Sequence, residues 1–400
     1  MAADLIPPAV LHSVPDIERA LTHLWTDKVT HRGDGEHHIA ARSSVLNLVV
    51  IAGRRETAEK CAATIEATGG RHPSRSLILS ALDVEGRPGL DATIRTASAD
   101  AAGTAGTGAE TIYVTVHGQT GHHLASIIVP LLVRDLPVAL WWPGDPQFGS
   151  HRGDRLLPIA DRLIVNGSSW SGDGLDRLSA MARVVRGRNL VVADFALLRQ
   201  ARWREALASV YDLPDLRPHL RAVRSISVEF AAPEAGDPAG LTNIVRPVYH
   251  VAWLASRLGM SVVEPMRRLP DGRRVATLRQ GDHDVAAEWL PSASDLGEGS
   301  TVRVQMVSNL RGAELVGAVT AGDCTVEVGI YDNGRERVRR TYQAPRLGDV
   351  DLLARALEDS SGDSVAADAL AMGGHLIAAE AEPHGAVARR RRKTQGTNDD

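Results

Sequence analysis

The first half of the chain alternates continuous apolar runs of strand length with amphipathic segments of helical period. The apolar runs are residues 45–52, 74–83, 111–118, 136–142, 160–167 and 189–195. The segments with apolar residues three and four positions apart are residues 13–28, 54–70, 121–135, 174–187 and 197–212. Such alternation is typical of an α/β domain with a doubly wound, mostly parallel, Rossmann-like sheet and helices on both faces. We place this domain at residues 1–220.

Beyond residue 220 the pattern changes to one strand, one long helical segment and then a series of short strands. The helical segment is residues 239–259, and the strands are residues 224–233, 273–280, 283–291, 300–310, 314–323, 324–334 and 337–345. The turn sequence Asp332-Asn333-Gly334 favours a tight antiparallel hairpin. We therefore expect a C-terminal α+β domain with antiparallel hairpins at residues 221–382. Residues 383–400 have no core-forming side chains and are predicted to be a disordered basic tail.

Composition and charge narrow the class of protein. The 400 residues are 44% apolar and 24% charged, with a formal net charge of −4, which gives no overall bias toward nucleic acid or an anionic membrane. The run Arg389–Lys393 leaves open a weak contact with an acidic partner or RNA. No export signal and no apolar run of about eighteen residues occurs, so a cytoplasmic protein is expected.

Two adjacent tryptophans stand out in a chain that is only 4% aromatic. The sequence LWWPGDPQF ends an apolar run with Trp141 and Trp142, then turns at Pro143 and Gly144 toward Asp145. Neighbouring strand residues point to opposite faces, so one indole should pack under a helix and the other should lie toward the edge of the sheet. Three interpretations stay open: both rings in the core, one indole in a partner-binding surface with residues 143–145, or a platform for stacking sugars.

Polar residues follow several of the other predicted strands. His117, Asn166 and Asp194 each lie at the carboxyl end of a strand. Ligands of open α/β sheets bind at this edge, so these residues are candidates for lining a strand-end cleft.

Signatures for nucleotide, metal and covalent chemistry are missing from the sequence. The turn after the first apolar run has Gly53 alone, where a dinucleotide-binding turn needs three glycines. The adjacent histidines 37–38 and 122–123 cannot all converge on one metal ion, since neighbouring helical residues point about 100° apart. We expect no cofactor, no metal and no catalytic residue.

Four phrases in register resemble one protein family. They are RHPSR, LPVALWWPGDP, DFALLRQARWREALASVYD and WLASRLG, in a region from about residue 40 to about residue 350. Together they are similar to the glucose-6-phosphate dehydrogenase assembly proteins, the OpcA family.

The resemblance implies a non-catalytic protein. It would bind glucose-6-phosphate dehydrogenase and promote its active oligomer, at the entry to the oxidative pentose phosphate pathway. The alternative is a sugar-phosphate- or nucleotide-binding enzyme with its site in the strand-end cleft. The resemblance does not extend to a list of contact residues, so the residues around Trp142 remain a hypothesis for partner binding.

Overall fold

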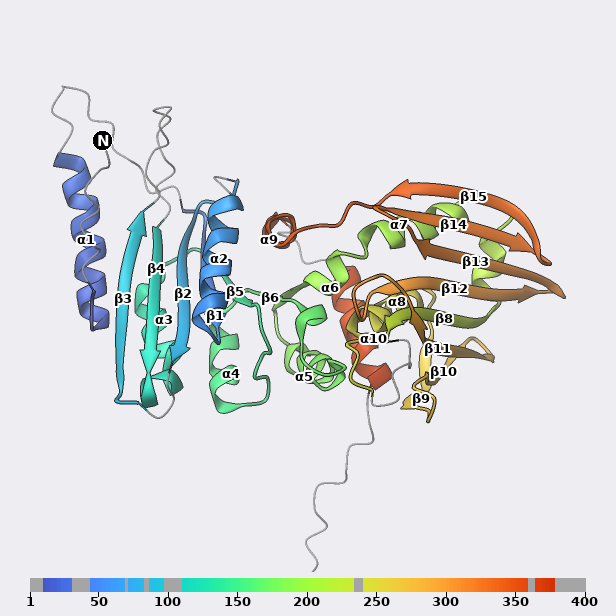
Figure 1. Ribbon diagram of the computed structural model, residues 1–400, viewed down its shortest axis with the longest axis horizontal. Helices are drawn as coiled ribbons and strands as arrows, with labels where there is room; N and C mark the ends of the chain where they lie inside the picture. Colours follow the sequence, from blue (N-terminus) through green and yellow to red (C-terminus); the bar gives the residue numbers. More distant parts are fainter. Residues whose placement is uncertain are drawn as a thin grey trace, which may run out of the picture.

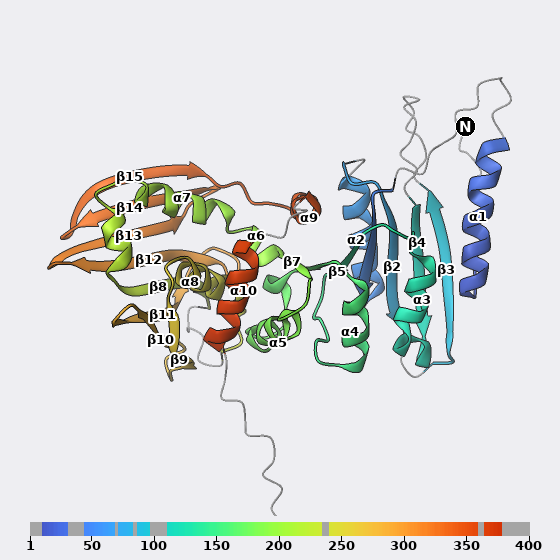
Figure 2. The same cartoon turned by 180° about the vertical axis from the view of Figure 1, so that it is seen from behind.

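The chain forms two sheets that lie at opposite ends of the molecule (Figures 1 and 2). The computed structural model describes residues 10–30, 44–68, 71–82, 86–96, 110–233, 240–358 and 364–377. The predicted disordered tail at 383–400, with Arg389–Lys393, lies outside the described residues.

The first sheet is mostly parallel, as predicted. Among the described residues its strands are β1 (Leu46–Ala52), β2 (Ser74–Leu82), β3 (Gly89–Thr96), β4 (Glu110–His117), β5 (Val138–Trp142), β6 (Arg162–Val165) and β7 (Val191–Asp194). Their order is β3-β4-β2-β1-β5-β6-β7, and only the β3–β4 pair of this sheet is antiparallel. Numbered by themselves, the parallel strands follow the order 3-2-1-4-5-6. Edge strand β3 was not predicted from the sequence.

Two apolar layers cover the two faces of this sheet. One layer contains α2 (Arg55–Thr68), α6 (Phe195–Leu198) and α9 (Asp349–Glu358), which pack on Leu48 and Val50 of β1. The other contains α1 (Val14–Thr30), α3 (Leu124–Leu131), α4 (His151–Leu156) and α5 (Leu175–Val185). Central strands β1 and β5 are buried along their whole length, which explains why their sequences are continuously apolar.

The second sheet is rich in antiparallel pairs. Its strands among the described residues are β8 (Val223–Ala232), β9 (Ser261–Arg268), β10 (Arg274–Gln280), β11 (His283–Ala293), β12 (Thr301–Leu310), β13 (Ala313–Ala321), β14 (Thr325–Asp332) and β15 (Arg335–Gln343). The order is β15-β14-β13-β12-β8-β11-β10-β9, with β8 and β11 parallel. The predicted hairpin after Asp332 is confirmed, because Asn333 and Gly334 both adopt positive φ angles and join β14 to β15.

Helices join the two sheets through a shared apolar core. Helices α7 (Ala201–Tyr211) and α8 (Val245–Arg257) lie against the second sheet. The last described helix, α10 (Ser364–Ile377), returns to pack on α5, α8 and β9 between the sheets (Figure 1). Short 3₁₀ turns are η2 (Gly118–His122), η3 (Leu157–Ile159), η4 (Gly167–Ser169) and η5 (Arg217–Arg221). Because α9 and α10 pack on helices of the first half, the boundary near residue 220 remains a proposal.

Candidate functional site at the strand ends

The tandem tryptophans point to opposite faces of β5, as expected, but both are buried. The Trp141 ring lies 6.1 Å from the Phe195 ring in the layer with α2 and α9. The Trp142 ring lies 5.9 Å from the Phe148 ring in the opposite layer. Their exposed fractions are 3% and 6%. The expectation that one indole faces the edge is wrong, because the chain after β5 folds back and Phe148 covers Trp142.

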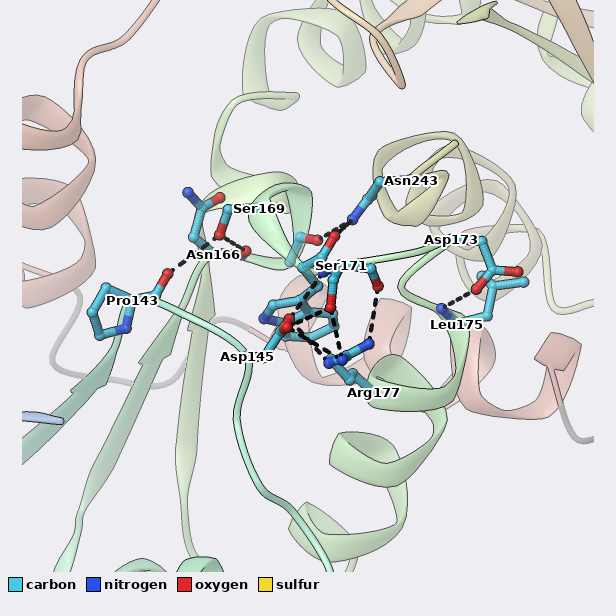
Figure 3. Close-up of polar contacts among 11 residues, drawn as sticks. Pro143, Asp145, Asn166, Ser169, Ser171, Asp173, Leu175, Arg177 and Asn243 are labelled. Atoms are coloured by element: carbon cyan, nitrogen blue, oxygen red, sulfur yellow. Dashed lines mark hydrogen bonds and ion pairs between the residues drawn. The ribbon is translucent and has the colours of Figure 1, made fainter. Parts of the chain in front are cut away.

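The loop after β5 is tied to the segment after β6, as Figure 3 shows. The Asp145 carboxylate accepts hydrogen bonds from the backbone N–H (3.0 Å) and the hydroxyl of Ser171. It also pairs with Arg177 at 3.0 Å. Two residues earlier in each segment, the Ser169 hydroxyl donates to the Pro143 carbonyl at 3.2 Å. Residues 143–145 therefore form a fixed, partly exposed surface above the buried indoles.

Asp194 ends β7 and is the most enclosed carboxylate at this edge, with an exposed fraction of 2%. Its Oδ1 accepts hydrogen bonds from the backbone N–H groups of Gly167 and Ala196, both at 2.8 Å. Its Oδ2 accepts from the Tyr249 hydroxyl on α8 at 2.9 Å. Burial raises the pKa of Asp194 to about 6, against the effect of these three donors and of the nearby Arg199.

Asn243 adds a second polar link between the halves of the chain. Its side-chain amide donates to the carbonyl groups of Gly167 and Trp170, both at 2.9 Å, and its Oδ1 accepts from the N–H of Val245 at the start of α8. The contact requires glycine at 167, since a Cβ there would lie 2.6 Å from Asp194 Oδ2 and 2.7 Å from Val245 Cγ1. The carboxyl ends of β6 and β7 thus join the first sheet to α8.

The three residues predicted to line a strand-end cleft do not come together. Asn166 lies near Asp194, and its Oδ1 accepts from Ser168 (2.8 Å) and Arg199 (3.0 Å). His117 instead bonds Asp91 of β3 at 3.0 Å, and this hydrogen bond is the main cause that lowers the pKa of Asp91. The separation follows from the strand order, since β4 and β6 are four strand spacings apart, about 19 Å.

Residues 243–249 were missed as linking residues by the sequence analysis. The predicted helix at 239–259 ran through Asn243, whereas α8 begins at Val245. Asparagine just before an amphipathic run is a recognised helix-start signal, so Asn243 could have been found. The partner of Tyr249 could not, because Asp194 is 55 residues away.

Across the part of the chain that the structure describes, no three His, Cys, Asp or Glu side chains are grouped closely enough to hold a metal ion. Of the helices in the described ranges, none has the length and apolar character needed to cross a membrane.

The fold and this site define a mixed α/β protein in which strand-end polar residues join two sheets. Comparison with known proteins then gives the family. One family model, the glucose-6-phosphate dehydrogenase subunit N-terminal domain, matches residues 64–183, and a second, the C-terminal domain of that subunit, matches residues 190–370. The chain belongs to the OpcA family of glucose-6-phosphate dehydrogenase assembly proteins.

Single proteins match this chain less closely than the family models do. The OxPP cycle protein OpcA of Synechocystis sp. is 28% identical over 148 residues, which are 36% of this chain and 29% of the relative's length. The match thus spans less than a third of that relative. An oxidoreductase from Sinorhizobium meliloti aligns with 84% of this chain and 96% of its own, at 11% identity and a TM-score of 0.47. A dehydrogenase from Clostridium difficile aligns with 83% and 97%, at 10% identity and a TM-score of 0.40.

Proposed function

We propose that this protein is a non-catalytic, cytoplasmic factor that binds glucose-6-phosphate dehydrogenase and promotes its active oligomer in the oxidative pentose phosphate pathway. The observation that carries the proposal is the pair of family models, which follow one another along residues 64–370 and are both named for a subunit of that dehydrogenase. A factor of this kind acts by binding, so its activity depends on surfaces and not on reacting groups.

The strand-end geometry supports a scaffold role. The parallel strands follow a Rossmann-like order, yet the polar residues at their carboxyl ends are used to join the two sheets. Asp194 is bonded to η4, α6 and α8, and Asn166 is bonded to Ser168 and Arg199. The Asp194–Tyr249 bond and the bonds of Asn243 to Gly167 and Trp170 hold the two sheets in a fixed relation, which favours a rigid surface for a partner.

For the contact surface we propose Pro143, Gly144 and Asp145, with Trp141 and Trp142 as the support beneath them. The loop is held by the Asp145–Arg177 ion pair and the Ser169–Pro143 hydrogen bond. A loop that is already ordered loses little conformational entropy when a partner binds. The indoles would then act through the shape of the loop and would not touch the partner.

The test is light scattering after size exclusion of this protein, the dehydrogenase and their mixture, with dehydrogenase activity measured across the same fractions. We expect the mixture to give a heavier species with higher activity per dehydrogenase subunit, whereas this protein alone turns over no glucose 6-phosphate. Unchanged mass and activity at all mixing ratios would contradict the proposal.

A further inference from the structure

A cavity of about 370 Å³ lies where α6, α7 and α8 meet one end of the second sheet. Its lining comes from residues 198–203, from α8, from the ends of β12, β13 and β14 with the loops beside them, from residues 344–347 and from Arg355 of α9. Its volume is in the range of pockets that hold small organic molecules. None of the residues in the strand-end hypothesis lines it.

The cavity is strongly cationic. Five arginines line it, Arg199, Arg202, Arg246, Arg346 and Arg355, and its described lining contains no aspartate or glutamate. Arg199 and Arg202 have carboxylate partners outside the lining. The other three form no ion pair with any described residue.

Arg246 is the most constrained of these arginines. Its one hydrogen bond to a described side chain is donated by Nη2 to the Ser300 hydroxyl at 3.1 Å. Burial, and then the positive charge of Arg199, lower the pKa of Arg246 to about 10. An anion between the guanidinium groups of Arg199 and Arg246 would stabilise these two like charges, because both are largely shielded from solvent.

Three residues of the lining each carry a buried polar atom that has no hydrogen-bond partner among the described residues. The atoms are Gln200 Oε1, His250 Nε2 and Thr301 Oγ1, on side chains of residues that are 3%, 2% and 7% exposed. Buried polar atoms in proteins are nearly always bonded, so three unbonded atoms just behind the wall of one cavity point to a ligand toward which these side chains turn when it binds. These atoms indicate a ligand independently of the positive charge of the arginines.

The orientation of the Gln200 side chain restricts the chemical class of the ligand further. Its Nε2 donates to the Arg246 carbonyl at 2.6 Å, which leaves Oε1 as an acceptor that needs an O–H or N–H group. Burial, with Arg204 and Arg246 nearby, lowers the pKa of His250 to about 3, so this ring is neutral at pH 7 and can donate or accept. A simple anion could satisfy the arginines but not Gln200.

We propose that this cavity binds a small hydroxylated phosphate ester of the sugar-phosphate class. Arg246, Arg346 and Arg355 hold the phosphate, whose two negative charges and several oxygens suit planar guanidinium groups. Gln200, Thr301 and His250 bind the hydroxyl groups. The site does not depend on the proposed role toward the dehydrogenase, and it would let a metabolite bind a protein with no catalytic role.

The chain contains its own reporter for this site. Cys324 lines the cavity and is exposed. The second cysteine, Cys61, is buried in α2, and burial raises its pKa to about 12, which makes it unreactive. A thiol reagent should therefore modify Cys324 first, and a bound ligand should slow that reaction.

The experiment measures the rate of iodoacetamide modification of Cys324 by mass spectrometry, on the full chain alone, with ribose 5-phosphate or glucose 6-phosphate as probes. At a probe concentration ten times its Kd, we expect the rate to fall about tenfold and the Tm to rise. Glucose should not protect, and inorganic phosphate should protect less than the esters. Equal protection by inorganic phosphate, or no protection by any ester at millimolar concentration, would overturn the proposal.

Substitutions in the lining test whether the ester binds in this cavity. Arg346→Gln and Arg355→Gln remove exposed charges and should fold, and each should weaken the ester's Kd about tenfold or more by loss of a charged hydrogen bond. Thr301→Val keeps the side-chain shape and should weaken esters while leaving the weaker binding of inorganic phosphate unchanged. The control is Arg183→Gln, an exposed arginine of α5 outside the cavity. An equal loss in the control would mean that net charge, and not this cavity, binds the ester.

Discussion

The strand-end edge and the arginine cavity are neighbouring regions that use polar groups in opposite ways. At the edge, the oxygens of Asp194 meet three donors, and Asn166 Oδ1 meets two. Among the residues that line the cavity, which begins four residues after β7, three buried polar atoms lack hydrogen-bond partners and three arginines lack carboxylate partners within the described structure.

The difference shows that hydrogen-bond satisfaction separates structural from ligand-binding polar residues better than position in the fold. The edge is the place where the α/β rule puts a ligand, yet its groups are already bonded to each other. A bonded network stabilises one arrangement of the two sheets, whereas unbonded buried groups remain costly until something binds. Variants in the two regions test this contrast.

Asp194→Ala should produce the largest loss of stability. It leaves the N–H groups of Gly167 and Ala196 and the Tyr249 hydroxyl without an acceptor, at about 1–3 kcal/mol for each buried group. We expect the free energy of unfolding to fall by about 3–9 kcal/mol in urea titrations. Thr301→Val in the cavity is the matched change, and it should lose under about 1 kcal/mol because its hydroxyl bonds no described group. Similar losses in both variants would remove the contrast.

Trp141→Ala and Trp142→Ala should each cost about 3–5 kcal/mol, as for large rings removed from a core. The two rings lie in different apolar layers, so neither variant should spare the fold. Trp253→Ala, on a half-buried position of α8, is the control and should cost less. If Trp142→Ala unfolded at the wild-type urea concentration, the burial of that ring by Phe148 would be contradicted.

The sequence predicted most of the fold because its apolar runs report burial directly. All six parallel strands, the hairpins and the turn at Asn333-Gly334 follow local patterns. Edge strand β3 was missed, as was β9, whose residues are largely exposed and so carry no apolar period. The parallel pairing of β8 with β11 was missed as well, because it depends on which strands meet and not on their own residues.

The site was predicted less well, for a physical reason. The residues that follow each strand were identified, but the strand order decides which of them meet, and His117 lies on the far side of β1 from Asp194. The cavity gathers arginines from residues 199 to 355. No spacing rule connects such distant positions, so this group emerges only from the tertiary fold.

Asp194→Asn should change the pH dependence of stability more than stability itself. Asparagine keeps the Oδ1 acceptor for Gly167 and Ala196, and its amide can donate to the Tyr249 oxygen. The folded pKa of about 6 is raised above the ordinary 3.8, so the wild type gains a contribution that is complete below about pH 4 and is lost as the pH rises through 6. We expect this contribution, up to about 3 kcal/mol, to be absent from the variant.

Urea titrations of both proteins from pH 4 to pH 7 measure this directly. The difference in unfolding free energy between wild type and Asp194→Asn should shrink or reverse in favour of the variant as the pH rises. Parallel curves would show that the three donors, and not burial, control the titration of Asp194.

Asp145→Ala should affect stability least and partner binding most. The Asp145–Arg177 pair is partly exposed, so its loss should cost under about 1 kcal/mol in unfolding free energy. The carboxylate also holds Ser171, and without it the loop after β5 would have to be ordered again when the dehydrogenase binds. We expect the Kd for the dehydrogenase to rise about tenfold, equivalent to about 1.4 kcal/mol.

The matched control is Asp284→Ala, which breaks an exposed aspartate–arginine pair of the same kind on the β10–β11 hairpin, where Asp284 lies 2.8 Å from Arg279. Its effect on stability should be no larger than that of Asp145→Ala, since the Asp284–Arg279 pair is the more exposed of the two and Asp145 also holds Ser171. Its effect on the Kd should be absent, because the hairpin lies in the other sheet. If both variants weakened binding equally, a general loss of negative charge would explain the result, and the surface at residues 143–145 would no longer be the contact. If neither variant weakened binding while the wild type bound, the dehydrogenase would bind at another face. Residues 143–145 would then contribute to the fold and not to the contact.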